Sequence, residues 1–149
     1  RFGLSVDVSS PADIASRIEV LKRRDAYEQD PEAFHALWEK EEQRLARRIA
    51  AGRKAVAGVE LSERLMTMMA HLCMQLGVDG LRGELTLMRA ARAKAALSKR
   101  KQATVEDVLA VAPMALRHRL RRDPLDEAGS KVRVDRAISE LAGEPVGNA

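Results

Sequence analysis

The residue types that most often carry catalysis are few and widely spaced in this sequence. His35, His71 and His118 form no HxxxH pair, and the single cysteine, Cys73, has no CxxC partner. Metal sites and nucleophile–base pairs need such groups at recognisable spacings, so we expect no metal site. A GxxxxGK[ST] loop, whose backbone cradles phosphates, is also absent from the sequence. We therefore do not expect this chain alone to hold a nucleotide.

What remains for chemistry is Arg82. Residues 77–80 (GVDG) predict a turn that delivers Arg82 to the start of a helix. A helix N-terminus presents unpaired N–H groups and a positive pole, and a guanidinium there adds to the attraction for a phosphate. On the residues alone, a plain surface arginine that pairs with Asp79 or Glu84 is an alternative that stays open.

The composition predicts that helices position this residue. A chain of 149 residues suits one domain with a single core. Hydrophobic residues make up 46% of the chain and aromatic residues only 3%, so the core must be aliphatic, as is typical of packed helices. The net charge of +4 is spread along the chain, unlike the basic stripe of a nucleic-acid binder. With no long apolar run, no signal peptide and one cysteine, we expect a soluble, cytoplasmic protein.

The N-terminal third predicts one strand and two helices. Residues 4–8 (LSVDV) alternate apolar and polar side chains, as a strand does, and a lone strand must pair with a sheet contributed by other sequence. Residues 9–11 (SSP) predict a serine N-cap and a proline in the first turn of a helix that stops by Asp30. Residues 30–32 (DPE) start a second, long helix, which we expect to be ended by Gly52 and the stretch at residues 56–58 (VAG).

The rest of the sequence predicts further helices, about five or six in all. Ser62 starts one whose apolar residues recur at helical spacing. These residues are Leu65, Met68, Met69, Leu72, Cys73 and Leu76. Thr104 and Asp107 match a capping box, and Pro113 should bend or restart the helix that follows. The basic run at residues 117–122 receives no site role.

Four ordered blocks of sequence resemble the ATPase subunit of magnesium chelatase, subunit I, a member of the AAA+ class. Residues 77–87 (GVDGLRGELTL) with 89–93 (RAARA) are similar to the lid helix with the second sensor motif. The other blocks are residues 1–6 (RFGLSV), 23–27 (RRDAY) and 118–127 (HRLRRDPLDE). The resemblance covers nearly the whole chain and is weakest at about residues 39–70.

The resemblance implies a mostly α fold, in which a helical AAA+ lid domain is preceded by one strand left over from the α/β ATPase core. Under this interpretation residues 1–9 end the core and residues 10–60 form connecting helices. The helical lid domain then occupies residues 61–143, and residues 144–149 form a frayed tail.

The resemblance also implies a function. Magnesium chelatase inserts Mg²⁺ into protoporphyrin IX in chlorophyll or bacteriochlorophyll synthesis, an ATP-dependent ligase reaction that forms nitrogen–metal bonds. A homo-oligomeric ring of I subunits hydrolyses ATP, paired with a D subunit, and a large third subunit binds the porphyrin. ATP with Mg²⁺ would be bound mainly by a core absent from this chain, so the fragment alone is not expected to be active. Neither a nucleic acid nor a membrane is expected as a partner.

Two residues receive roles by motif match. Arg82 would be the second sensor arginine, which contacts the γ-phosphate of the nucleotide held by its own subunit. Arg1, directly before Phe2 and Gly3, would be the arginine finger that acts on the ATP of the neighbouring subunit.

Other interpretations remain open. The chain could be the lid of another AAA+ protein, such as the chelatase D subunit, a cobalt chelatase or a DNA-remodelling ATPase. A nucleic-acid-binding helical module is a further alternative, favoured by the basic run at residues 117–122. That run lacks aromatic side chains on which bases could stack.

Overall fold

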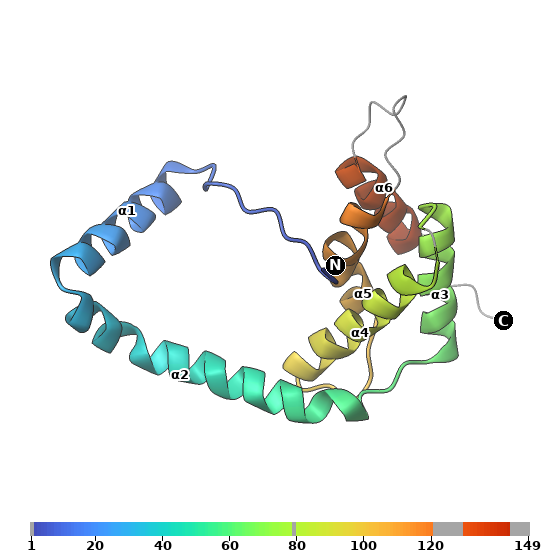
Figure 1. The fold of residues 1–149 in the computed structure, drawn as a ribbon, viewed down its shortest axis with the longest axis horizontal. Helices are drawn as coiled ribbons and strands as arrows, with labels where there is room; N and C mark the ends of the chain where they lie inside the picture. Colours follow the sequence, from blue (N-terminus) through green and yellow to red (C-terminus); the bar gives the residue numbers. More distant parts are fainter. Residues whose placement is uncertain (1, 79, 121–129, 144–149) are drawn as a thin grey trace. The chain divides into compact units, whose positions relative to one another are not determined.

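The computed structural model describes residues 2–78, 80–120 and 130–143, and the described chain is mostly helical, as predicted (Figure 1). Six α-helices and two short 3₁₀ turns are formed in these residues. They are α1 (Ile14–Gln29), α2 (Pro31–Ala55), η1 (Val56–Gly58), α3 (Glu63–Gln75), α4 (Arg82–Leu97), α5 (Val105–Leu116), η2 (Arg117–Arg119) and α6 (Ser130–Gly143). The chain divides into two compact units. The first consists of Arg1–Val6 with Ala51–Ala149, and the second consists of Asp7–Ala50.

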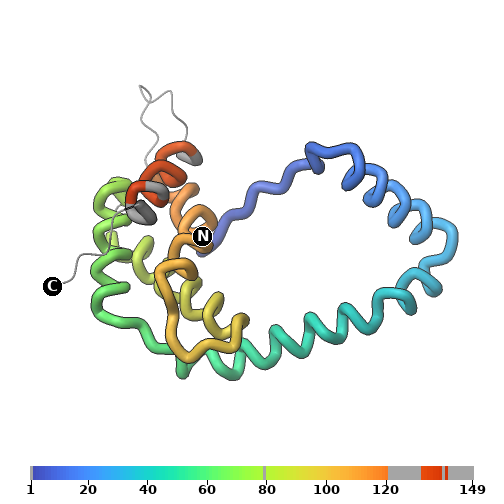
Figure 2. Tube along the Cα trace, turned by 180° about the vertical axis from the view of Figure 1, so that it is seen from behind, coloured from blue at the N-terminus to red at the C-terminus, as the bar shows by residue number. Residues whose placement is uncertain are grey.

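The unit Asp7–Ala50 holds α1 and most of α2, which meet at a corner (Figure 2). Asp30 makes this corner, because its backbone N–H closes α1 on the Ala26 carbonyl and its carboxylate accepts from the Ala33 N–H of α2 at 2.9 Å. The predicted end of the first helix and start of the second are thus confirmed. Aromatic contacts support the corner, with the rings of Tyr27 and Phe34 edge to face at 5.7 Å.

The start of α1 differs from the prediction. The helix begins at Ile14, and its N-cap is Asp13, whose carboxylate accepts from the Ser16 N–H at 2.7 Å. That hydrogen bond lowers the pKa of Asp13. Aspartate caps a helix as well as serine does, and the residue before Pro11 is driven away from helical geometry. Ser9, Ser10 and Pro11 therefore precede the helix, and none of them lies in its first turn.

The strand predicted at residues 4–8 is not formed. The described chain there lacks regular secondary structure. The backbone N–H of Ser5 donates to the Met114 carbonyl of α5 at 2.8 Å, so this segment pairs with a helix end. Among the described residues the β-type pairing is limited to an isolated bridge between Glu60 and Gln102. Alternating side chains make a strand only where a neighbouring strand completes the ladder, and the described chain supplies none.

The second helix ends at Ala55, directly before the predicted stop at Val56–Gly58, but Gly52, which was expected to take part in ending it, does not. Helix α2 continues to Ala55, and Gly52 is buried within it. A Cβ placed at Gly52 would lie 3.0 Å from Cδ2 of Leu97, at the end of α4. Glycine is therefore used here for close approach between two helices, a need that outweighs its helix-breaking tendency.

The core lies between α3, α4, α5 and α6, with the most extensive contact between α4 and α5. The predicted apolar stripe of α3 is confirmed, since all of its residues are buried except Met68, which is partly buried. Small side chains dominate the inner faces of the two central helices. Ala91 and Ala95 of α4 and Ala112 and Ala115 of α5 are completely buried. Such side chains let helix backbones approach closely.

Helix α3 ends in the predicted glycine turn. The Val78 N–H donates to the Cys73 carbonyl and the Gly77 N–H to the Met74 carbonyl, both at 3.0 Å. Gly77 has a φ of +64°, so the turn is a Schellman motif, in which glycine avoids the strain of left-handed backbone. The chain then enters α4 at Arg82, where the sequence predicted a helix start.

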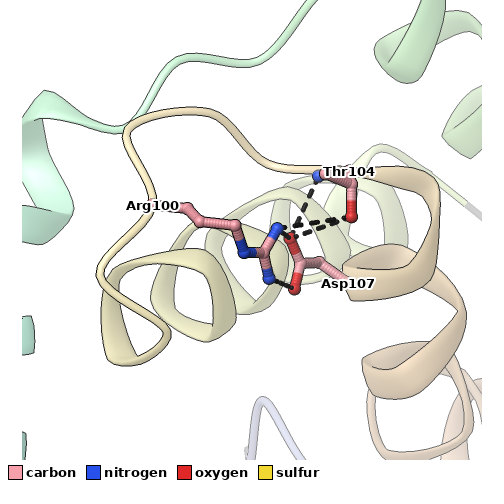
Figure 3. A network of polar contacts seen from close by, with 3 residues as sticks. All are labelled: Arg100, Thr104 and Asp107. Atoms are coloured by element: carbon pink, nitrogen blue, oxygen red, sulfur yellow. Dashed lines mark hydrogen bonds and ion pairs between the residues drawn. The ribbon is translucent and has the colours of Figure 1, made fainter.

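Helix α5 begins with the predicted capping box and continues through Pro113 without restarting. Asp107 is 1% exposed and accepts from Arg100 Nη1 and Nη2 at 2.6 and 2.5 Å and from the Thr104 N–H at 3.0 Å (Figure 3). Burial alone raises the pKa of Asp107, but the hydrogen bonds from Arg100 and Thr104 outweigh it and hold the pKa below its ordinary value of 3.8. The buried side chains around Pro113, among them Ala112 and Leu116, offset the roughly 3 kcal/mol that a proline costs inside a helix.

Replacing Asp107 with asparagine should lower the free energy of unfolding by about 2 kcal/mol at pH 7, because an amide cannot serve both nitrogens of Arg100. The carboxylate has a lower pKa in the folded state than in the unfolded state. Its stabilisation is therefore complete well above pH 3.8 and is lost as the pH falls through the folded value.

Urea unfolding at pH 7 and in a series down to pH 2 checks this expectation, with Asp25→Asn, an exposed carboxylate, as the control. The difference between the wild-type chain and Asp107→Asn should shrink in acid. A difference that stays constant would mean that the charge of Asp107 is not what stabilises this end of α5.

Candidate phosphate site at the start of helix α4

A hollow of about 550 Å³ opens beside the first turns of α4. Its lining comes from the N-terminal segment, the α3–α4 turn, α4 and η2, all within one compact unit. The lining residues are Phe2, Gly3, Val78, Arg82, Thr86, Arg89, His118 and Arg119. Three of these side chains are arginines and none is a carboxylate, so the hollow is suited to an anion.

Arg82, the predicted site residue, is the first residue of α4 and is exposed. Leu81 precedes it as N-cap without a side-chain hydrogen bond, so among the described residues no side chain caps the first N–H groups of the helix. No ion pair between Arg82 and Glu84 forms in the described chain, and Oε2 of Glu84 is buried without a hydrogen-bond partner. Asp79, the other partner considered, lies outside the described residues.

Gly83 allows α4 to begin where it does. A Cβ at this position would lie 2.6 Å from Cγ1 of Val78 and 3.6 Å from both Sγ of Cys73 and Cδ2 of Leu116. The first turn of α4 is therefore pressed against the α3–α4 turn and the end of α5. This close packing fixes the position of the first turn of α4, and with it the position of the Arg82 backbone.

Sequence reasoning missed three cationic or titratable residues of the hollow. Arg89 follows Arg82 by seven positions, about two helical turns, so a shared face could have been inferred from that spacing. His118 and Arg119 belong to the basic run that received no role. Their approach to α4 depends on the turn after α5, and no local pattern indicates it.

Arg119 is held by several acceptors. Its Nε donates to the Ala115 carbonyl at 3.0 Å, and its Nη2 lies 3.3 Å from the Phe2 carbonyl oxygen and 3.4 Å from that of Gly3. The same nitrogen lies 3.3 Å from Oγ1 of Thr86. Nε2 of His118 is 3.3 Å from the Phe2 carbonyl oxygen.

The rest of the basic run lies elsewhere. Arg117 pairs with Asp135 of α6 at 3.2 Å, and Leu120 is buried. Residues 121 and 122, and the predicted break at residues 123–124, lie outside the described residues, as does the tail at residues 144–149.

Arg1, the other predicted site residue, also lies outside the described residues. The two residues that follow it in the sequence, Phe2 and Gly3, line the same hollow as Arg82. The structure thus brings the segment that follows Arg1 together with the start of α4.

Cys73 is not poised for chemistry. Burial, helped by the nearby Glu84 carboxylate and opposed by Arg119, raises the pKa of its thiol to about 12. A thiol that stays protonated at neutral pH packs as a small apolar side chain. In the part of the chain that the structure describes, no three His, Cys, Asp or Glu side chains are grouped to hold a metal ion. No helix there is long and apolar enough to cross a membrane.

Helices α3 to α6 belong to the lid of an AAA ATPase. Residues 66–140 match the AAA lid domain family, and the chain belongs to this family. The predicted class of fold is therefore confirmed. A crystal structure described as that of "a putative ATPase" from Cytophaga hutchinsonii superposes with a TM-score of 0.66 over 99% of this chain and 47% of its own, at 17% identity.

The predicted resemblance to magnesium chelatase subunit I is also confirmed. The "Magnesium-chelatase 38 kDa subunit" proteins of Cereibacter sphaeroides and Acidiphilium rubrum are each 50% identical to this chain over 141 residues, 95% of its length. "Magnesium-chelatase subunit ChlI-2, chloroplastic" of Arabidopsis thaliana is 36% identical over the same share. The chain spans less than half of these relatives, namely 42%, 41% and 34% of their respective lengths.

Substitution of Gly83 by alanine tests the packing at the start of α4. The stiff Val78 side chain has to move, and overpacking of this kind costs about 1–3 kcal/mol of unfolding free energy. That cost exceeds the ~1 kcal/mol that alanine can gain over glycine in a helix.

The matched control is Gly58→Ala, since no heavy atom lies within 4 Å of a Cβ at that position. Urea unfolding should show a loss for Gly83→Ala and little change for Gly58→Ala. Equal stability of the two variants would contradict the tight contact with Val78.

Proposed function

We propose that this chain is the C-terminal part of the ATP-hydrolysing motor subunit of magnesium chelatase, which drives insertion of Mg²⁺ into protoporphyrin IX. The observation that carries the proposal is the hollow at the start of α4, where Arg82 lies in an AAA lid at a helix N-terminus whose N-cap, Leu81, makes no side-chain hydrogen bond. The names of relatives that are 50% identical over 95% of this chain support the choice of reaction.

In this role Arg82 is the second sensor arginine. A guanidinium stays charged at any physiological pH, and its planar fork can hold two oxygens of a γ-phosphate. The positive pole of α4 adds to the attraction, and Arg89 lines the same hollow. Because the γ-phosphate leaves on hydrolysis, the position of the lid follows the state of the nucleotide. ATP and its Mg²⁺ are held mainly by an ATPase core with a P-loop, which this chain lacks.

Arg1 serves as the arginine finger for the ATP site of the neighbouring subunit. A finger stabilises the charge that develops on the transferred phosphoryl group. This role requires a homo-oligomeric ring, and the reaction further requires the chelatase D subunit and the large porphyrin-binding subunit. The fragment alone is inactive under this proposal, because the nucleotide site is completed by other sequence and by other subunits.

Arg82→Ala in the full-length subunit should lower ATP hydrolysis by the assembled ring by about 10²- to 10³-fold, the usual cost of losing one preorganised donor to a developing charge. Folding should be preserved, because Arg82 is exposed. Steady-state ATPase assays and thermal unfolding check both expectations, with the exposed Arg64→Ala on α3 as the control. Unchanged hydrolysis in the assembled ring would refute the sensor role.

Arg1→Ala should lower hydrolysis about 10³-fold or more in rings made only of the variant. Since the finger acts on the neighbour, variant subunits mixed into wild-type rings should lower activity more than dilution does. The ATPase rate measured against the mixing ratio gives the answer. A loss merely proportional to the variant fraction would count against action across the subunit interface.

A further inference from the structure

We infer that Arg119 is a positioning residue that fastens the segment following Arg1 to the first turns of α4. The lid of each subunit would thereby set the arginine finger that the same subunit offers to its neighbour. This inference rests on the proposed roles of Arg1 and Arg82, and it assigns a task to a basic residue that those roles leave unused.

The first step is the grip on the N-terminal segment. Nη2 of Arg119 reaches the carbonyl oxygens of two successive residues, Phe2 at 3.3 Å and Gly3 at 3.4 Å. His118 adds a contact of 3.3 Å with the Phe2 carbonyl. A little further along, the Ser5 N–H donates to the Met114 carbonyl at 2.8 Å. The backbone directly after Arg1 in the sequence is thus bound to the end of α5 and to η2.

The second step is the connection to α4. Oγ1 of Thr86 lies 3.3 Å from Nη2 of Arg119 and also donates to the Arg82 carbonyl at 2.7 Å. A Cβ at Gly3 would lie 3.7 Å from Cγ2 of Thr86, an ordinary van der Waals contact. Arg119 therefore touches both the N-terminal segment and the side chain that is bonded to the backbone of Arg82. A shift of the first turn of α4 has to strain these hydrogen bonds or move the segment with it.

The third step separates Arg119 from the other arginines of the hollow. Its Nε is committed to the Ala115 carbonyl at 3.0 Å, and its Nη2 to the acceptors described above. Across residues 2–78, 80–120 and 130–143, the side chains of Arg82 and Arg89 form no such hydrogen bonds. Arg82 and Arg89 therefore keep their donors for an anion, whereas Arg119 uses its planar fork to hold backbone.

A complementation experiment on the full-length subunit tests this assignment. Rings made only of Arg119→Ala should lose about 10- to 100-fold in kcat for ATP, as expected for a misplaced catalytic group. Their KM for ATP should change less than about twofold, because the subunit's own nucleotide contacts are intact. Arg82→Ala subunits have the converse defect, since their own site is impaired but their finger is well placed.

Mixed rings of Arg119→Ala and Arg82→Ala should therefore hydrolyse ATP faster than either variant alone. In such rings an Arg82→Ala subunit offers a correctly placed Arg1 to the ATP site of an Arg119→Ala neighbour, whose own Arg82 is intact. Mixed rings of Arg1→Ala and Arg82→Ala test the premise in the same assay. If this second pair recovers activity and the first does not, Arg119 does not act on the finger, although the proposed function stands. If neither pair recovers activity, the finger and sensor roles fail and the inference fails with them.

Two milder variants keep the test decisive if Arg119→Ala unfolds, which thermal unfolding would reveal. Arg119→Lys keeps the charge but loses the fork, and Thr86→Val keeps the shape but loses the acceptor. Both should show smaller losses in kcat that Arg82→Ala subunits restore. Arg64→Ala, an exposed arginine on α3, should change neither kcat nor the outcome of mixing. If kcat falls in either milder variant and mixing with Arg82→Ala subunits does not restore it, the fall reflects a less stable lid, and the positioning role is overturned.

Discussion

The close contact between α4 and α5 is the constraint on which the candidate site depends. Completely buried alanines, among them Ala91 and Ala112, face the contact from both helices. At the start of α4, Gly83 removes the side chain that would strike Val78. At its end, the chain turns through Lys99, a non-glycine residue with a φ of +58°, and Arg100 then reaches Asp107 in the capping box of α5. Both ends of α4 are thus fixed to neighbouring elements, and Arg82 is carried on a helix that cannot easily slide.

Local sequence signals predicted the helix starts that are decided by a side chain next to its own backbone. Ser62 accepts from the Leu65 N–H, and Asp107 accepts from the Thr104 N–H, each within one helical turn. Gly77 ends α3 for an equally local reason, its positive φ. Such interactions depend on the identity of residues three or four positions apart, so they can be recognised without the fold.

The predictions that failed depend on partners remote in the sequence. Gly52 was expected to help residues 56–58 end a helix, but the helix runs past it, because Leu97 needs the space that glycine leaves. The alternation at residues 4–8 was expected to make a strand, but its Ser5 N–H meets the end of α5. The residues of the candidate site likewise fall into those that local sequence predicts and those that only the fold brings together. Arg82 was recognisable from the turn before it, whereas the approach of Arg119 to Thr86 requires the whole α4–α5 packing.

The exposure of Arg82 suits the proposed sensor role on electrostatic grounds. A cation at the positive pole of a helix is mildly unfavourable, and in water this repulsion is small because the solvent screens it. An exposed arginine also gains little from an anion, typically below about 1 kcal/mol. When an ATPase core closes over the hollow and excludes water, the same charges interact several times more strongly. The attraction for a phosphate would then appear only in the closed arrangement, which couples nucleotide binding to the position of the lid. A deeply buried arginine would lose this dependence on closure, and it would have needed a permanent carboxylate partner in the open state.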